Sequence, residues 1–183
     1  MANATSTIVL SARAVARTVT RMADEIIERN DGTERLILVG IQRRGVQIAS
    51  RIAAVIAARE GVDVPLGALD ITLYRDDLQT VGPRPVVGKT HLPVGIEGMH
   101  VVIVDDVLFT GRTIRAALDE LADFGRPARV ALAVLVDRGG RELPIQPDIV
   151  GKHVDVPAGS HVDVSVAELD GKDEVVLVTP AVP

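Results

Sequence analysis

The sequence contains no cysteine and no tryptophan, and aromatic residues make up only 2% of the chain. Without cysteine the protein can form neither disulfides nor catalytic thiolates. No N-terminal apolar stretch is typical of a signal peptide, and no run approaches the roughly 18 apolar residues of a membrane-spanning helix. A net charge of −5 gives no general attraction to nucleic acid, although basic residues gathered on one face could still provide it. We therefore expect a cytoplasmic protein that does not contact membranes.

Aliphatic residues, in contrast, are abundant. Apolar residues make up 47% of the 183 positions, which is enough for the core of one domain. Aliphatic runs without aromatics are typical of parallel strands that are buried on both faces. Such runs occur at residues 36–39, 101–104 and 130–136. We predict a single α/β domain over residues 1–183, with a central parallel sheet, a flexible loop at about 75–98 and a C-terminal β element at about 149–183.

Helical spacing of apolar residues predicts three helices between and around these strands. Ser11 is a suitable N-cap for the first helix, Gly61 ends the second, and the segment 125–127 ends the third. Alternating residues from Leu69 to Tyr74 predict a half-exposed strand. The residues expected to face the core are Val15, Val19, Met22 and Ile26 in the first helix, Ala49, Ile52, Val55 and Ile56 in the second, and Ile114, Leu118 and Leu121 in the third.

The most informative stretch is VVIVDDVLFTGRT, at residues 101–113. A buried strand is followed at its carboxyl end by Asp105 and Asp106, then by a small hydroxyl-containing loop and the start of a helix. Backbone N–H groups at a helix N-terminus are unpaired and attract phosphate. Carboxylates bind Mg²⁺ or accept hydrogen bonds from ribose hydroxyls. The stretch therefore predicts a site for a phosphate and a sugar.

Two other predicted strands end in polar clusters. Arg43 and Arg44 lie between glycines after the strand at 36–39, and Asp137 and Arg138 follow the strand at 130–136. Arginine binds phosphate oxygens in a planar, bidentate manner, and glycine lets backbone N–H groups approach a ligand. Ligands of open α/β sheets bind at the carboxyl ends of the strands, so we expect the three clusters to converge. A ligand with phosphate at two ends and a ribose between them fits this set.

The long irregular segment from Arg75 to Gly98 precedes the acidic stretch. A loop of this length in a compact domain is often a lid over a site. A surface excursion with no role in the site is the alternative, and part of the segment could pair as a hairpin.

Residues 101–113 resemble the signature of type I phosphoribosyltransferases, which bind phosphoribosyl pyrophosphate (PRPP). The resemblance is closest to the PyrR branch of that superfamily. It includes GIQRRG at 40–45, DITLYRDDL at 70–78, VDDVLFTGRT at 104–113 and LAVLVDRGGRELPI at 132–145. PyrR proteins are uracil phosphoribosyltransferases, and in many bacteria they also bind leader mRNA of pyrimidine operons and attenuate transcription.

The resemblance implies the type I phosphoribosyltransferase fold and a role for each cluster. Asp105, Asp106 and Arg44 would be catalytic, and the two aspartates would address the ribose hydroxyls and bind Mg²⁺, the expected cofactor, through water. Arg43 and Arg44 would bind the pyrophosphate, with a cis peptide between them. Asp137 and Arg138 would lie beside the uracil. The residues implied in PRPP binding are Arg43, Arg44, Arg75, Asp105, Asp106, Val107, Leu108, Phe109, Thr110, Gly111, Arg112 and Thr113.

The resemblance also implies partners beyond PRPP, uracil and UMP. A pyrimidine-operon leader RNA would contact positions that match the RNA-binding region of the branch, namely Arg17, Thr20, Arg21, Arg141 and Lys152. Asp24, Gly140 and Gln146 depart from the branch, whose members have histidine, histidine and arginine there. These exchanges weaken the attraction for phosphate. The family also implies a homodimer or homotetramer.

Two other hypotheses fit the same residues. One is a nucleotide-sensing RNA-binding regulator without catalysis, and the other is a purine phosphoribosyltransferase. The segment VDRGGREL favours uracil over a purine by resemblance alone. No residue stands out as the general base for uracil, so its proton would go to Asp106 or to solvent.

Overall fold

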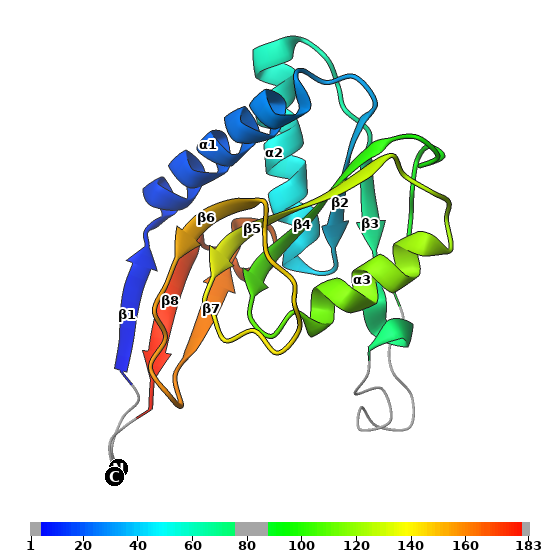
Figure 1. Cartoon of the computed structure of the whole chain (residues 1–183). Coiled ribbons are helices and arrows are strands. Elements are labelled where there is room, and N and C mark those ends of the chain that lie inside the picture. The colour runs from blue at the N-terminus through cyan, green and yellow to red at the C-terminus, as the bar shows by residue number, and fades with distance from the viewer. Residues whose placement is uncertain (1–4, 76–87, 181–183) are drawn as a thin grey trace.

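The computed structural model describes residues 5–75 and 88–180. Its centre is a sheet of five strands in the order β3-β2-β4-β5-β6, in which every neighbouring pair is parallel (Figure 1). The predicted α/β class with a central parallel sheet is therefore confirmed. The strands are β2 (Leu36–Ile41), β3 (Leu66–Leu69), β4 (His100–Leu108), β5 (Arg129–Asp137) and β6 (Ile149–His153).

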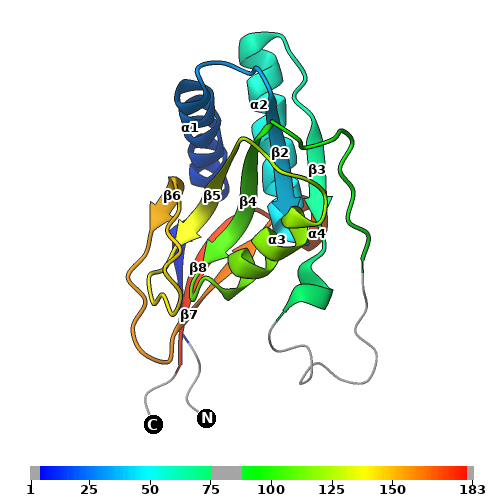
Figure 2. The same cartoon turned by 45° about the vertical axis from the view of Figure 1, so that its right-hand side comes forward.

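Helices cover both faces of this sheet. In Figure 2, α3 lies in front of the sheet and α2 lies behind it. Alternate residues of β2 enter opposite cores, since Leu38 packs in the core with α1 and α2 and Val39 packs in the core with α3. Burial on both faces explains why the strands are uninterrupted aliphatic runs. The three main helices are α1 (Ala12–Asn30), α2 (Arg44–Glu60) and α3 (Arg112–Ala122).

The ends of the first two helices follow the sequence signals. The Ser11 side chain accepts a hydrogen bond from the Ala14 N–H at 3.4 Å, and Asp31 ends α1 in the left-handed conformation with φ 55°. Gly61 ends α2 with φ 68°. The predicted core residues of α1 are all buried. None of the helices in the described part of the chain combines the length and apolar character that a membrane span requires.

A second, antiparallel sheet has the strand order β1-β8-β7. Its strands are β1 (Thr5–Leu10), β7 (His161–Ser165) and β8 (Glu174–Thr179), and the one-turn helix α4 (Ala167–Asp170) connects the last two. We call this sheet with α4 the small sheet. The prediction placed residues 149–153 in the C-terminal β element, but they form β6 and pair with β5 in the central sheet.

The half-exposed strand predicted over residues 69–74 is wrong. β3 ends at Leu69, and a 3₁₀ helix, η1 (Ile71–Tyr74), follows it. The cause is Asp70, whose side chain accepts a hydrogen bond from the Thr72 N–H at 3.0 Å and caps the turn. Asp and Asn side chains compete with strand pairing in this way.

One core residue of α3 was also predicted wrongly. Leu118 is 39% exposed, whereas Ile114, Ala117 and Leu121 are buried. These three lie at i, i+3 and i+7, which places them on one stripe of the helix. Leu118 lies beside that stripe because each helical residue turns by about 100°.

Glu120 is a buried acid on the same helix. Its side chain is 4% exposed, one carboxyl oxygen accepts a hydrogen bond from the Thr90 hydroxyl, and the other has no partner in the described part of the chain. Burial raises the pKa of Glu120, and the charges of Asp70 and Asp123 raise it further. The charged form is therefore less stable in the folded protein than in the unfolded chain.

Replacement of this acid by glutamine should change the pH dependence of stability. The folded-state pKa of Glu120 lies above its unfolded value, so the folded protein loses stability as pH rises from about 4 through the raised pKa. We expect Glu120→Gln to raise the melting temperature relative to the parent at about pH 8 and to lose that advantage at about pH 4. Thermal unfolding at both values measures this, with exposed Glu60→Gln as control. A difference that is the same at both pH values would contradict the assignment.

Candidate active site

A cleft of about 300 Å³ lies at the carboxyl ends of β2, β3 and β4. Acidic and basic side chains both line it, as expected for a ligand that contains phosphates and hydroxyls. Of the residues predicted to bind PRPP, the cleft brings together Arg43, Arg44, Arg75, Asp105, Asp106, Val107 and Thr113. It also includes Ile41, Gln42, Asp70, Ile71 and Thr72.

The acidic pair lies within β4 and not after it. The strand continues to Leu108, and its pairing with β5 extends from His100 to that residue. Asp105 is buried at 6% exposure, while Asp106 is half-buried. Each carboxylate accepts a hydrogen bond from the next backbone N–H, at 2.9 Å for Asp105 and 2.8 Å for Asp106. The backbone N–H groups at this strand end thus fix the orientation of both acids.

The two acids differ in their electrostatics. Burial raises the pKa of Asp105 well above its usual range, and the neighbouring Asp106 carboxylate raises it further. Ionisation of both adjacent carboxylates costs free energy, because their negative charges repel each other where little water is present to screen them. Asp106, which is the more accessible of the two, is therefore the acid that presents negative charge to the cleft.

The loop between β2 and α2 supplies the two arginines. The peptide bond between Gln42 and Arg43 is cis, one residue earlier than the resemblance implied. Arg43 is exposed, and Arg44 begins α2 and is half-buried. The Arg44 guanidinium donates two hydrogen bonds to Asp170 of α4, at 2.9 and 3.2 Å. These bonds raise the pKa of Arg44 above its ordinary value, so the group stays charged.

The glycines of this loop have a different role from the one predicted. A Cβ atom on Gly45 would lie 2.5 Å from the Val104 carbonyl oxygen, and one on Gly40 would lie 2.4 Å from the Val46 Cα. Both contacts are with backbone atoms, which cannot move aside. The glycines therefore let the start of α2 pack directly against β2 and β4, which places Arg44 next to the acids.

The segment after β4 connects the strand to α3. Leu108 is buried in the core, so only its backbone is available to a ligand. Gly111 is the N-cap of α3 with φ 93°, and the Thr110 hydroxyl accepts a hydrogen bond from the Arg112 N–H at 3.3 Å. The Arg112 side chain forms an ion pair with Glu142 at 2.8 Å. The unpaired N–H groups of the first turn of α3 give this end of the cleft a positive potential.

Asp137 and Arg138 lie at the end of β5, next to β4, but they are not among the residues that line the cleft. The buried Asp137 carboxylate pairs with Arg141 at 2.8 Å and accepts a hydrogen bond from the Gly139 N–H at 3.0 Å. Arg138 lies over the Phe109 ring, 3.9 Å from its centroid, and donates to the Ser160 carbonyl at 3.2 Å. Arg138 thus connects Phe109, which follows β4, to Ser160, the residue before β7.

The residues predicted to contact RNA are in two places. Arg17 and Lys152 are exposed on α1 and β6, and Thr20 donates its hydroxyl hydrogen to the Ala16 carbonyl. Arg21 donates to the carbonyl oxygens of residues 150 and 151, at 3.1 and 2.5 Å, so it also attaches α1 to β6.

Arg141 lies apart from that group, in the segment after β5. Its side chain is 13% exposed and donates to the carbonyl oxygens of Ile145 and Phe109, at 2.8 and 2.9 Å, besides pairing with Asp137. These contacts hold the segment after β5 in place, and little of the Arg141 side chain is accessible to RNA.

The sequence reasoning missed three polar residues of the cleft: Gln42, Asp70 and Thr72. Asp70 directly follows β3, so it stands at the end of a fourth strand. Its position would have been a signal, but the prediction of a continuous strand to Tyr74 placed it inside the strand. The Gln42 amide donates to the Lys89 carbonyl at 3.2 Å, and the Gly88 N–H donates to the Asp70 carboxylate.

The predicted loop at 75–98 is described only in part. Residues 76–87 lie outside the described residues, and the role of the segment as a lid stays a prediction. Arg75 lines the cleft. His91 forms an isolated antiparallel bridge with Ala68 of β3, outside the segment, with both hydrogen bonds at 2.8 Å, and a hairpin within the segment stays a prediction.

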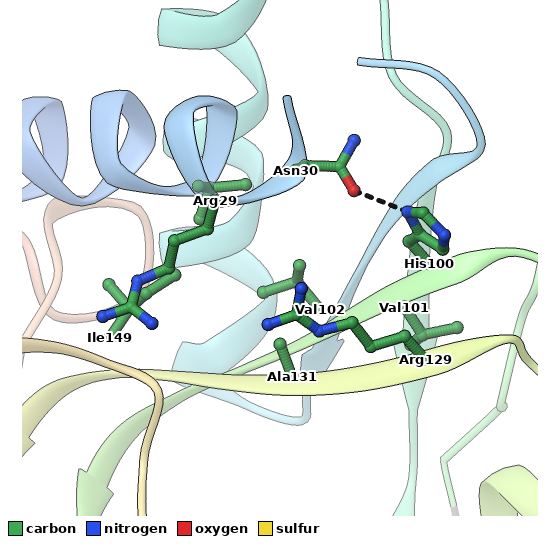
Figure 3. A pocket seen from close by; sticks show the side chains of 9 residues that line it. Arg29, Asn30, His100, Val101, Val102, Arg129, Ala131 and Ile149 are labelled. Carbon is green, nitrogen blue, oxygen red and sulfur yellow. Dashed lines mark hydrogen bonds between the residues drawn. The ribbon is translucent and has the colours of Figure 1, made fainter. Parts of the chain in front are cut away.

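Another hollow lies at the opposite, amino-terminal ends of β4 and β5 (Figure 3). Figure 3 shows the hydrogen bond between Asn30 and His100, at 2.8 Å, and the Arg29 and Arg129 side chains extending over an apolar floor. Its volume is about 20 Å³, which is room for about one water molecule. The cleft at the other end of the sheet is therefore the candidate site.

The close packing at Gly45 gives a prediction for the cleft. We expect Gly45→Ala to destabilise the protein by about 1–3 kcal/mol, because the new methyl group meets backbone atoms of β4. Ligand binding in the cleft should weaken as well. Gly95→Ala is the matched control, since nothing lies within 4 Å of its Cβ position. Denaturant unfolding of both variants measures the effect, and equal stability of the two would contradict the packing argument.

Comparisons with known proteins agree with this geometry. A family described as "Phosphoribosyl transferase domain" matches residues 5–169. A curated "Bifunctional protein PyrR" from Chloroflexus aurantiacus is 59% identical over 92% of this chain and 93% of its own length. One of the same name from Thermus thermophilus is 56% identical, with 92% and 93% coverage.

Solved structures share the fold at much lower identity. The hypoxanthine phosphoribosyltransferase of Trypanosoma cruzi has a TM-score of 0.69 at 18% identity, covering 94% of this chain and 96% of that one. A hypoxanthine-guanine phosphoribosyltransferase of Bacillus anthracis has a TM-score of 0.67 at 16% identity, with 98% and 99% coverage. At this identity the likeness shows the fold alone.

Proposed function

Because the chain belongs to the phosphoribosyl transferase domain family and, within it, to the PyrR proteins, we propose that it transfers the phosphoribosyl group of PRPP to uracil. The products are UMP and pyrophosphate. One observation supports this most strongly: the cleft combines the acidic pair of β4 with the two-arginine loop of α2 and with the start of α3. These are the groups that a ribose bearing a phosphate and a pyrophosphate requires.

Each end of PRPP has a matching part of the cleft. The first turn of α3, with Thr110 and Thr113, binds the 5′-phosphate through backbone N–H and hydroxyl groups. Asp105 and Asp106 accept hydrogen bonds from the ribose hydroxyls. Arg43 and Arg44 bind the pyrophosphate, to which the guanidinium group is suited in shape and charge. Arg75 also lines the cleft and would contact PRPP.

In the reaction, uracil N1 forms a bond to the anomeric carbon as the bond from that carbon to the pyrophosphate oxygen breaks. Positive charge develops on the ribose ring and negative charge on the leaving group. Asp106 faces the first charge and the arginines face the second, so the cleft is preorganised for the transition state. The N1 proton passes to Asp106 or to solvent.

The residues present also fit the Mg²⁺ that the family implies. Magnesium is usually held by one or two carboxylates, several waters and substrate phosphates, without an all-protein cage. Asp106 presents a carboxylate in the cleft beside Asp105, and no group of three or more potential ligands occurs among residues 5–75 and 88–180. The acidic pair would therefore hold the ion through water, and the ion would neutralise charge on the pyrophosphate.

The base that we assign is uracil, with Asp137 and Arg138 beside it. Arg138 and Phe109 form a wall at the end of β5, next to the acidic strand. The Asp137 carboxylate is engaged with Arg141, so it shapes this wall and does not itself bind the base. Hypoxanthine and guanine are the competing bases, and a turnover assay with all three decides between them.

The catalytic proposal is tested with purified protein, Mg²⁺, PRPP and labelled uracil. We expect UMP to form, and Asp106→Asn to lower kcat by about 100-fold because the charge that faces the ribose is lost. Asp63→Asn, an exposed aspartate outside the cleft, is the matched control. An absence of UMP above background would overturn the enzymatic function, and normal turnover of Asp106→Asn would overturn the role of that residue.

We also propose that the protein binds the leader RNA of pyrimidine genes in response to UMP and so regulates transcription. The name shared by its relatives, "Bifunctional", supports a second role. Arg17 and Lys152 are exposed on α1 and β6 and available to phosphates. Gly140 stands where members of the branch have histidine. It has φ 76°, and a Cβ atom there would lie 2.4 Å from the Phe109 ring, so a side chain at this position would have to displace the ring.

A gel shift with the pyrimidine leader RNA tests the regulatory role. We expect UMP to tighten binding, and Arg17→Ala and Lys152→Ala each to weaken it and to reduce the salt dependence by about one phosphate contact. Arg126→Ala, an exposed arginine after α3, is the control. Equal competition by unrelated RNA, or no response to UMP, would contradict specific regulation. A cytoplasmic location and a homodimeric or homotetrameric assembly stay predictions.

A further inference from the structure

Resting on the phosphoribosyl transfer proposed above, we propose that Asp170 of α4 is a positioning residue for Arg44 in pyrophosphate binding. Asp170 lies in the small sheet, 126 residues along the chain from Arg44. Its carboxylate does not line the cleft, whereas Arg44 does. Asp170 would therefore act on the ligand through the arginine and not by contact.

The hydrogen bonds between the two residues use one edge of the guanidinium group. Arg44 Nε donates to Asp170 Oδ2 at 3.2 Å, and one terminal nitrogen donates to Oδ1 at 2.9 Å. A guanidinium group has five N–H donors, so three are left. These three have no hydrogen-bond partner among the described residues: two are on the terminal nitrogen that does not contact Asp170, and one is the second N–H of the nitrogen that does. A phosphate group can bind this end of the guanidinium while Asp170 holds the Nε edge.

Asp170 is itself held in place. Its Oδ2 atom accepts a hydrogen bond from the Val166 N–H at 2.8 Å, which fixes the carboxylate against the turn of α4. The hydrogen bond from Arg44 lowers the pKa of Asp170, so the carboxylate stays charged at neutral pH. Arg44 is thus fixed by an anchored partner, and a long side chain that is ordered in advance loses less entropy on binding.

A second arginine on α2 makes it possible to distinguish the positioning of Arg44 from the attachment of α4 to α2. Arg51 lies seven residues after Arg44, on the same face of α2. It pairs with Glu168 at 2.5 Å and with Asp173 at 2.8 Å, on either side of Asp170. Arg51 does not line the cleft. Both arginines attach α4 to α2, but only Arg44 also lines the cleft.

The Arg51 pairing therefore supplies a matched control. Asp170→Asn and Glu168→Gln each remove one carboxylate charge from α4 and one charge-assisted pairing with α2. If Asp170 positions Arg44, the two variants should have similar melting temperatures but different affinities. We expect Asp170→Asn to weaken binding of inorganic pyrophosphate by about tenfold and to raise the KM for PRPP by a similar factor. Glu168→Gln should leave both values near those of the parent.

Isothermal titration with pyrophosphate and Mg²⁺ measures the affinity without turnover, so its outcome does not depend on whether uracil is the acceptor. A double variant completes the test. In an Arg44→Lys background, Asp170→Asn should have no further effect on pyrophosphate affinity, because its effect passes through the guanidinium. Equal losses in Asp170→Asn and Glu168→Gln, or a full effect in the Arg44→Lys background, would overturn the proposal. Absence of UMP with the parent protein would instead overturn the proposed reaction.

Discussion

The close approach of the start of α2 to β4 is the constraint on which the site depends. Gly40 and Gly45 have no side chains, and their Cβ positions would overlap backbone atoms of neighbouring segments. The helix can therefore begin directly beside the acidic end of β4. Arg43 and Arg44, at that beginning, come to share one cleft with Asp105 and Asp106. A larger residue at either glycine would separate the positive and negative halves of the site.

Near this contact, burial and paired side chains determine which groups are charged and how they are oriented. Asp105 is buried and its pKa is raised, so the more accessible Asp106 presents the negative charge. Arg44 is kept charged and oriented by Asp170, and Arg141 fixes Asp137 at the end of β5. In both pairs a charged side chain near the site is held in place by an oppositely charged partner. The result is a set of ligand-binding groups that needs little rearrangement when PRPP arrives.

The sequence alone was sufficient for the parallel sheet and for two of the three polar clusters at its edge, which line one cleft. Aliphatic runs on doubly buried strands and helical stripes in α1 are strong local signals, and the motif at 104–113 is specific. Local signals failed where a side chain overrode the pattern, as Asp70 did when it capped η1. They also failed for distant partners, since nothing near Arg44 in the sequence points to Asp170, which is 126 residues away. Such pairings depend on how the sheets pack, which residue spacing does not encode.

The small sheet also bears on how the protein folds. β1, at residues 5–10, has β8, at residues 174–179, as its only strand neighbour in the described part of the chain. Contacts of such large sequence separation slow folding, because closing the intervening chain costs conformational entropy. α4, which holds Arg44, lies in the same sheet. The ordered arginine of the cleft therefore depends on a contact between segments that are 126 residues apart in the chain.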